Sequence, residues 1–350
     1  MNRRTVWFAA LACVALFSCA TTGGGDGALH GENTVENTAQ PSIAGSFLDR
    51  GLLFAMRGDF DLAIEDFTEA INLDGDFAPA FLQRGKAYSA RQVRLSGGVG
   101  EGFGISPFVG GKKTDDHERA IADLSQAIEL QPNDAVAYNW RAYVYDSIGE
   151  WDNAILDCNQ AIKLDPNSAM AYNNRGLAYD NKDDYDLAIA DYTQAIRLDP
   201  NLAVAYSNRG NACAARGNYD QAIADLGQAI KLDPNFAVAY YNRGFAYYGR
   251  VGPDPAIADF SQAIKLEPNF AVAYFDRGNA YAARGDYSLA IADYGQAIKI
   301  VPNFVSAYFV RGSVYNEIGD RDRGTADYNR ARRIEANGAA SLQSWRGVLQ

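Results

Sequence analysis

The sequence predicts an all-α fold, a solenoid of about eight stacked helix–turn–helix repeats. Six prolines are spaced 34 residues apart and each is followed by asparagine: Pro132, Pro166, Pro200, Pro234, Pro268 and Pro302. Each interval contains two amphipathic segments joined by a short turn that is polar or contains glycine. A hairpin of this kind cannot bury its own apolar face, so it must stack on its neighbours.

Residues 1–18 have the pattern of a secretory signal peptide. A short basic start with Arg3 and Arg4 precedes an apolar stretch from Thr5 to Phe17. This stretch is shorter than the roughly 20 residues that are needed to span a bilayer. The sequence therefore predicts an exported protein.

The end of this segment, Leu16-Phe17-Ser18-Cys19, resembles the processing box of bacterial lipoproteins. The resemblance implies that Cys19 becomes the lipidated first residue of the mature protein. Such an anchor is stable because each buried methylene contributes about 0.8 kcal/mol. By the same resemblance, Ala20 after the cysteine favours the outer membrane over the inner one. The alternative is an ordinary signal peptide that is cut after a nearby small residue.

Residues 19–43 are expected to form a flexible tether between the lipid on Cys19 and the folded body. They are rich in glycine, threonine and asparagine and contain few apolar side chains. Such a composition cannot bury enough surface to fold. The expected location is the bacterial cell envelope, with the membrane contacted through the N-terminal lipid only.

The repeats begin three residues after each proline and occupy residues 44–338. Their ranges are 44–77, 78–134, 135–168, 169–202, 203–236, 237–270, 271–304 and 305–338. In the fifth repeat, Tyr206, Gly210 and Cys213 share one face of the first helix. Pro234 ends the second helix, because proline has no amide N–H to donate.

These residues resemble the tetratricopeptide repeat, in which an aromatic residue, Leu-Gly, Tyr, Ala, a second aromatic residue, Ala and Pro stand at fixed offsets. The fourth repeat supplies Tyr172, Gly176, Tyr179, Ala188, Tyr192, Ala195 and Pro200. The resemblance covers residues 44–338. It implies a right-handed superhelical α-solenoid whose concave surface, lined by the first helix of each repeat, binds peptides or protein segments.

The repeats at the two ends depart from this pattern. Gly75 replaces the proline of the first repeat, and Ala336 replaces that of the last. Atypical terminal repeats are expected in such arrays. Residues 339–350 are predicted to form a short helix that caps the last exposed face.

The second repeat carries a glycine-rich insertion at about residues 92–117. Two patterns of phosphate-binding loops suggest themselves there, and neither fits. Residues 100–104 (GEGFG) follow a helix rather than a strand, and residues 111–114 (GKKT) have Ser106 where a phosphate loop needs glycine. We expect a loop at one rim of the stack, whose apolar residues dock on a partner or on the repeat surface.

Composition argues against catalysis, metal binding and nucleic-acid binding. The formal net charge is −11, so the average field repels a polyanion. The two histidines, His30 and His117, lie outside the repeat helices as placed above. The repeat body therefore has no imidazole for general base catalysis or metal ligation. We expect no enzyme activity and no cofactor.

Each repeat places an arginine on the apolar face of its first helix, where the tetratricopeptide pattern has leucine: Arg50, Arg84, Arg141, Arg175, Arg209, Arg243, Arg277 and Arg311. Each second helix places an aspartate on its buried face: Asp66, Asp123, Asp157, Asp191, Asp225, Asp259, Asp293 and Asp327. Because an unpaired buried charge is prohibitive, we predict structural Arg–Asp pairs within a repeat or between neighbours. The alternative is that the guanidinium groups extend to the groove and never meet the aspartates.

The resemblance also implies a partner-binding groove at first-helix positions that face away from the second helix. Carried onto this sequence, these positions are Asn139, Trp140, Tyr143, Asn173, Asn174, Leu177, Asn208, Asn211, Tyr241, Asn242, Phe245, Tyr248, Phe275, Asp276, Asn279 and Phe309. The set is nearly free of lysine and arginine, which argues against a carboxylate clamp. Asparagine can donate and accept at once, which suits an extended peptide backbone.

Aromatic residues of this groove predict the main anchor site, because such side chains are frequent binding hot spots. The cluster spans the sixth to eighth repeats and comprises Tyr241, Phe245, Tyr248, Phe275 and Phe309. The alternative is that these rings only pack on one another between repeats.

These expectations describe a non-enzymatic scaffold or adaptor for protein–protein interactions in the bacterial cell envelope. The alternative is a dedicated subunit of an outer-membrane assembly, secretion or solute-uptake complex, which recognises one fixed partner. In both cases the expected partners are proteins or peptides.

Overall fold

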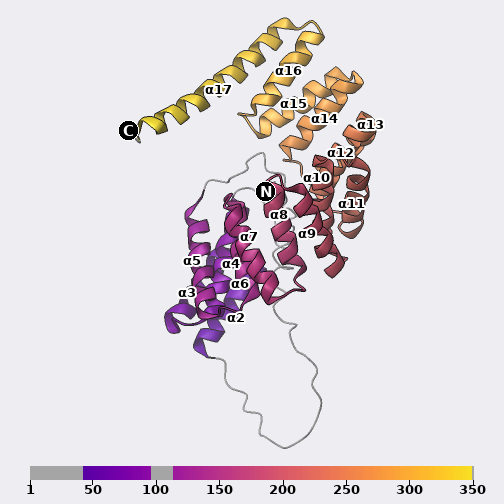
Figure 1. Ribbon diagram of the computed structural model, residues 1–350. Coiled ribbons are helices and arrows are strands. Elements are labelled where there is room, and N and C mark those ends of the chain that lie inside the picture. The colour runs from indigo at the N-terminus through magenta and orange to yellow at the C-terminus, as the bar shows by residue number, and fades with distance from the viewer. Residues whose placement is uncertain (1–41, 96–112, 349–350) are drawn as a thin grey trace, which may run out of the picture. The chain divides into compact units, whose positions relative to one another are not determined.

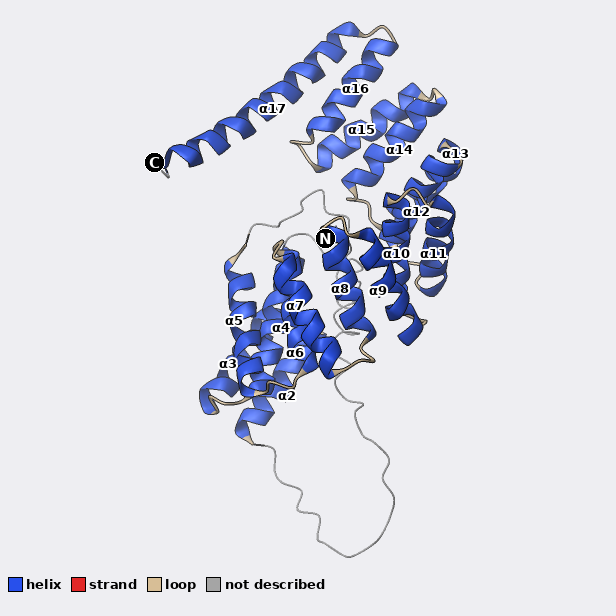
Figure 2. Ribbon diagram, viewed as in Figure 1, coloured by secondary structure: helices blue, strands red, loops and turns tan. Residues whose placement is uncertain are grey.

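The computed structural model describes residues 42–95 and 113–348, which form sixteen helices, α2 to α17, and no strand (Figures 1 and 2). The chain is thus the all-α solenoid of about eight helix pairs that the sequence predicts. It divides into two compact units, with the boundary between Leu198 and Asp199. The predicted signal peptide, Cys19 and all of the predicted tether up to residue 41 lie outside the described residues.

The first unit is a stack of four helix pairs. Its helices are α2 (Ile43–Met56), α3 (Phe60–Leu73), α4 (Ala78–Leu95), α5 (Asp115–Leu130), α6 (Ala135–Ser147), α7 (Trp151–Leu164), α8 (Ala169–Asn181) and α9 (Tyr185–Leu198). Within each pair the two helices pack along their length, and the second helices α3, α5 and α7 also pack on the first helix of the next pair. The first helices α2, α4, α6 and α8 contact one another in succession.

The second unit repeats this arrangement with four further pairs. Its helices are α10 (Ala203–Ala215), α11 (Tyr219–Leu232), α12 (Ala237–Arg250), α13 (Pro253–Leu266), α14 (Ala271–Arg284), α15 (Tyr287–Ile300), α16 (Val305–Glu317) and α17 (Arg321–Val348). The first helices α10, α12 and α14 lie side by side. Among the described residues, no helix is both long enough and apolar enough to cross a membrane.

An Asp-Pro-Asn sequence builds the turn to the next repeat after three of the second helices, α7, α9 and α11. Pro166 follows the last residue of α7 by two positions and cannot continue the helix. Asp165 accepts a hydrogen bond from the backbone N–H of Asn167 at 3.0 Å, and Asp233 accepts one from Asn235 at 2.9 Å. The aspartate therefore closes the turn with its own side chain, as is typical of this residue.

Apart from the second repeat, part of whose turn lies outside the described residues, the turn within each repeat contains one residue with a left-handed backbone conformation. Gly217 occupies this place in the fifth repeat, with φ of 76°. Asp183 does so in the fourth, with φ of 62°. Glycine adopts this conformation without steric cost and aspartate tolerates it better than most residues, so both sequences allow the reversal.

The two helices of a repeat approach closely where a glycine of the first faces a large side chain of the second. A Cβ atom on Gly176 would lie 2.8 Å from the Tyr192 ring. In the third repeat the sizes are exchanged, because Ala142 stands in place of this glycine and the small Cys158 in place of the ring. A larger side chain on the first helix is thus matched by a smaller one on the second helix, so the volume of this layer of the core stays similar.

The helices extend further into the predicted insertion than the sequence indicated. Helix α4 continues to Leu95 and α5 begins at Asp115, so only residues 96–112 of the range 92–117 lie outside the described residues. His117, which we had placed outside the repeat helices, lies in the first turn of α5 and is buried. Its ring and backbone form a capping box with Thr114.

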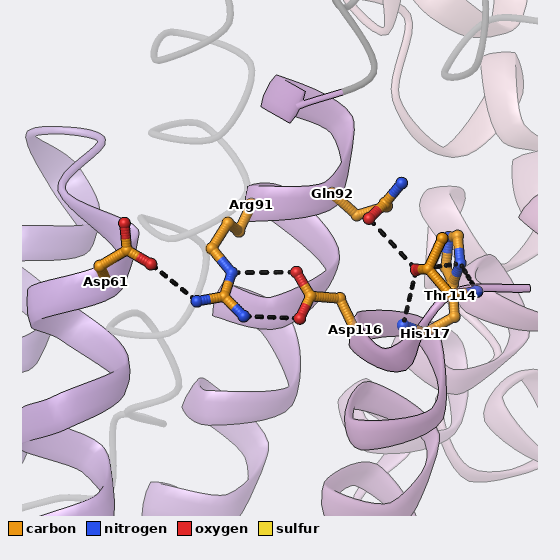
Figure 3. A network of polar contacts seen from close by, with 6 residues as sticks. All are labelled: Asp61, Arg91, Gln92, Thr114, Asp116 and His117. Atoms are coloured by element: carbon orange, nitrogen blue, oxygen red, sulfur yellow. Dashed lines mark hydrogen bonds and ion pairs between the residues drawn. The ribbon is translucent and has the colours of Figure 1, made fainter.

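A polar network connects these helix ends (Figure 3). Arg91 donates to both carboxylate oxygens of Asp116, at 2.9 and 2.5 Å, and to Asp61 of α3 at 2.7 Å. The hydroxyl of Thr114 donates to the side-chain carbonyl of Gln92 at 3.2 Å. The residues on either side of the insertion are therefore joined directly to each other and to the preceding repeat.

Helix α17 differs from the other second helices in length. It runs from Arg321 to Val348, so residues 339–348, for which we expected a separate capping helix, continue it without a break. Ala336 stands where the other repeats have the proline that ends the helix. Alanine has the highest helix propensity of all residues, which allows the continuation.

Candidate functional site

The structure brings each of the eight arginines to the aspartate of its own repeat. In every pair Nε and Nη2 of the arginine donate to the two carboxylate oxygens, at distances between 2.6 and 2.9 Å. This is the planar, bidentate geometry that makes Arg–carboxylate pairs strong. The predicted Arg–Asp pairs are therefore confirmed. The alternative, in which the guanidinium groups extend to the groove and never meet the aspartates, is wrong.

The aspartates are buried, and aromatic rings flank the guanidinium groups. The Arg277 guanidinium carbon lies 5.6 Å from the centre of the Tyr274 ring and 5.7 Å from that of Tyr281. The hydrogen bonds that Arg277 donates to Asp293 raise the pKa of Arg277, in spite of its partial burial. The Arg277 guanidinium group therefore remains charged at any physiological pH, and it serves structure rather than proton transfer.

A second contact of these arginines was not foreseen from the sequence. Nη1 of Arg141 donates to the Ser125 hydroxyl of the preceding repeat at 3.0 Å, and Nη1 of Arg277 donates to Ser261 at 3.0 Å. Arg175 contacts Asn159 in the same way at 2.7 Å. The sequence contains an indication of this contact, because a small polar residue stands 16 positions before each of these three arginines.

The predicted groove residues differ in how far they are exposed. Seven are buried: Trp140, Asn173, Asn174, Leu177, Asn208, Tyr241 and Asn242. Six are partly buried: Asn139, Tyr143, Asn211, Phe275, Asp276 and Asn279. Three are exposed: Phe245, Tyr248 and Phe309.

Several polar groove residues form hydrogen bonds between successive first helices. The amide of Asn174 donates to the side-chain carbonyl of Asn139 at 3.0 Å, and the Tyr241 hydroxyl donates to Asp276 at 2.6 Å. Their donors and acceptors are thus engaged in joining repeats. They are less available to a partner than the sequence alone suggested.

The five aromatic residues of the predicted anchor site also differ in exposure, and two of them pack against rings in the interior of the stack. The Tyr241 ring packs on Phe270, with 5.1 Å between ring centres, and Phe275 packs on Phe304 at 5.0 Å. These two rings belong to the interior of the stack. They contribute packing energy, which any test of binding must take into account.

The remaining three aromatic residues of this cluster project into solvent. Phe245 is 50 % exposed, Tyr248 39 % and Phe309 57 %. Phe245 and Tyr248 lie one helical turn apart on α12, so they share one side of that helix. Phe309 on α16 rests against Tyr328, with 5.1 Å between ring centres. Large exposed rings on one set of helices are the feature expected of a binding surface.

Two ionisable residues on first helices of the first unit were also missed. Lys86 on α4 is 1 % exposed, and its ammonium group lies 5.1 Å from the centre of the Trp140 ring. Asp146 on α6 accepts a hydrogen bond from Asn181 at 3.0 Å. Burial raises the pKa of Asp146 to about 7, and the bond from Asn181 offsets only part of this effect.

No site for a metal ion is found within residues 42–95 and 113–348, since no group of three or more suitable side chains comes together there. The predicted lipidation site, Cys19, lies outside these ranges. Cys158 and Cys213 are free and buried, and burial raises the pKa of both thiols. Neither is therefore a reactive thiolate at neutral pH.

Family models of one kind match most of the repeat region. A model described as TPR repeat matches residues 147–183, 210–250 and 278–319. Models described as tetratricopeptide repeat match residues 112–134, 124–155, 169–202, 191–224 and 260–292. No curated protein sequence matches the chain.

Solved structures resemble the chain as well. MamA is 31 % identical over 47 % of this chain and 96 % of its own, with a TM-score of 0.44. A tetratricopeptide repeat protein from Parabacteroides merdae is 18 % identical over 77 % of this chain and 98 % of its own, with a TM-score of 0.56. YrrB, described as a TPR protein with an unusual peptide-binding site, is 25 % identical over 53 % of this chain and 95 % of its own, with a TM-score of 0.42.

Breaking one buried ion pair should destabilise the second unit strongly. Asp293→Asn leaves the part-buried Arg277 without its carboxylate, so we expect the free energy of unfolding to fall by about 3–5 kcal/mol. Urea denaturation followed by circular dichroism measures this loss. Replacing both residues by apolar ones, Arg277→Met with Asp293→Leu, should cost less than the single change.

The first repeat offers a matched control for this experiment. Its arginine, Arg50, has a side chain that is 58 % exposed, whereas that of Arg277 is 17 % exposed. Asp66→Asn should therefore lower the stability much less than Asp293→Asn, because water can solvate the freed guanidinium group. Equal losses at the two sites would mean that burial does not determine the contribution of these pairs.

The raised pKa of Asp146 predicts a pH dependence of stability. Since its folded-state pKa of about 7 lies above the ordinary value, the folded chain binds a proton that the unfolded chain has released, and stability falls as the pH rises through this window. Between about pH 5.5 and pH 8 the loss should be about 2 kcal/mol. Asp146→Asn should remove that part of the pH dependence, whereas the exposed Asp152→Asn should leave it unchanged. Identical pH profiles for Asp146→Asn and the unmodified protein would refute the assignment.

Proposed function

Because the chain belongs to the tetratricopeptide repeat family, we propose that it is a non-enzymatic scaffold that binds a peptide or protein segment along its first helices. The observation that carries this proposal is the exposure of Phe245, Tyr248 and Phe309 on first helices of the second unit. Exposed rings supply a large contact area at low conformational cost. We call the side formed by α10, α12, α14 and α16 the first-helix face.

The way in which the ionisable groups are used supports a binding role rather than a catalytic one. The eight repeated arginines and aspartates neutralise each other within the repeats. The buried thiols Cys158 and Cys213 have raised pKa values and are poor nucleophiles. The groups that remain for contact with a partner are aromatic rings and hydrogen-bonding side chains.

The proposed place of action is the bacterial cell envelope, with a lipid anchor on Cys19. Support comes from the sequence alone: a short apolar stretch followed by Leu16-Phe17-Ser18-Cys19. A tethered binding surface suits an adaptor that collects partners near the membrane. The second candidate is a dedicated subunit of an outer-membrane assembly, secretion or uptake complex. Pull-down from solubilised envelopes separates the two, because an adaptor captures several partners and a subunit captures one.

Removing the exposed rings should abolish binding without changing the fold. For Phe245→Ser with Phe309→Ser we expect capture of envelope partners to fall by about 30-fold, as for loss of a hot spot. The melting temperature should hardly change, because exposed substitutions cost at most about 0.5 kcal/mol. Quantitative pull-down and thermal denaturation give the two readouts.

Two variants serve as controls for this experiment. Leu289→Ser removes a similarly exposed apolar side chain (46 %) from the second helix α15 and should leave capture unchanged. Tyr241→Ala should lower the melting temperature, because its ring packs in the interior. Undiminished capture by the double phenylalanine variant would exclude the first-helix face as the binding surface.

The proposed anchor can be tested by a single substitution. Cys19→Ala removes the only thiol that the processing box offers, so the protein should lose its acyl mass increment and leave the membrane fraction. Intact-mass spectrometry and membrane fractionation measure these changes. A variant that keeps the mass and the membrane association of the wild type would show that Cys19 is not the anchor.

A further inference from the structure

The first-helix face of the second unit has no unpaired positive charge. Its helices α10, α12, α14 and α16 lie entirely within the described residues and contain six arginines, and all of these are engaged with aspartates of second helices: Arg209, Arg243, Arg250, Arg277, Arg284 and Arg311. The same helices contain no lysine. Their acidic residues are Asp276 and Glu317. Because each of the six arginines has an aspartate partner, the two further charges on these helices are those of Asp276 and Glu317, and both are negative.

Asp276 differs from the repeated aspartates of the Arg–Asp pairs because the side chains that donate to it are neutral. It accepts hydrogen bonds from the Tyr241 hydroxyl at 2.6 Å and from the Asn279 amide at 3.1 Å. Asp293, by contrast, accepts two bonds from a guanidinium group. Burial raises the pKa of Asp276, which means that its negative charge is poorly solvated. A cation placed beside it would relieve this cost.

Aromatic side chains lie next to this carboxylate. Asn279 joins it to the Tyr294 hydroxyl, which donates to the Asn279 carbonyl at 2.9 Å. Phe245 and Tyr248 stand four and seven positions after Tyr241 on α12, so they follow it on the same side of that helix. The exposed rings of Phe245 and Tyr248 can attract ammonium and guanidinium groups through their π faces, and the alkyl stems of lysine and arginine pack against such rings.

We propose that the first-helix face of the second unit binds an extended, cationic protein segment, whose lysine or arginine side chains lie over Phe245 and Tyr248 and beside Asp276. This inference rests on the proposed function, since it specifies the segment that the scaffold takes. Three independent features favour it: the absence of a free cation on these helices, the carboxylate with neutral partners, and the exposed rings. An acidic segment would find no counter-charge here, and a second copy of this chain carries the same negative net charge.

The charge preference can be measured with random peptides displayed on phage and selected on the full chain. Peptides should be enriched on the wild type relative to Phe245→Ser with Phe309→Ser, and they should contain more lysine and arginine than the starting library. If no peptide is enriched over that variant, both the proposed function and this inference fail. If peptides are enriched but are neutral or acidic, the face binds segments and only the cationic preference is wrong.

A charge variant then tests the role of the carboxylate on one selected peptide. Asp276→Asn should lower the affinity of the chain for that peptide about five- to tenfold at low salt, as expected for the loss of one charge. It should also reduce the salt dependence of the affinity. Asp322→Asn removes the same charge from the second helix α17, where the side chain is exposed, and should leave the affinity unchanged. A Lys→Gln version of the peptide should bind wild type and Asp276→Asn equally. Equal losses for Asp276→Asn and Asp322→Asn would overturn the local contact and leave only a general effect of net charge.

Discussion

The Arg–Asp pair of each repeat is the interaction on which the rest of the structure depends. In the first unit Arg141 links three helices, because its guanidinium group binds Asp157 on α7 and Ser125 on α5 while its own backbone belongs to α6. Such a group tolerates little change in distance, since every lost bond leaves a buried charge unpaired. The constant spacing of the repeats follows from this constraint. An insertion is tolerated in the second repeat because it lies in the turn, and the pair of Arg84 with Asp123 keeps its bidentate geometry.

The pairing of charges inside the repeats also determines which side chains are left to bind a partner. The repeated charges are neutralised inside the stack, and the asparagine and tyrosine side chains of the inner positions bind one another across repeats, as Asn139 and Asn174 do. The first helices of the second unit keep the exposed rings of Phe245, Tyr248 and Phe309 and the carboxylates of Asp276 and Glu317. A partner can be held there by ring contacts and charge complementarity without any change in the repeats, which suits a rigid scaffold.

Much of the fold and of the ion-pair ladder could be predicted from the sequence, because both depend on spacing within a repeat. Arg277 and Asp293 lie on faces that a helical period identifies directly. The binding surface could be predicted only in part. A helical period shows that Tyr241 and Phe245 are on the same helix side, but not that Phe270 covers the first ring and leaves the second exposed. That depends on residues at the junction with the next repeat, whose position is a property of the stacked structure.

The raised pKa of Asp146 has the same origin. An aspartate at the end of a first helix would ordinarily be solvated, and here the next repeat buries it against Asn181. Single-repeat reasoning cannot anticipate burial that arises from stacking. It does anticipate pairs such as Arg175 with Asp191, which are complete within one repeat.

The account makes the first helices of the second unit the surface that meets a partner, and crosslinking in living cells tests this most directly. A photoreactive phenylalanine analogue at position 245, on α12, should form a covalent adduct with another protein upon illumination. The same analogue at position 289, on the second helix α15, where Leu289 is similarly exposed, should form none. Adducts at position 289 without any at position 245 would contradict the account, because the partner would then lie on the second helices.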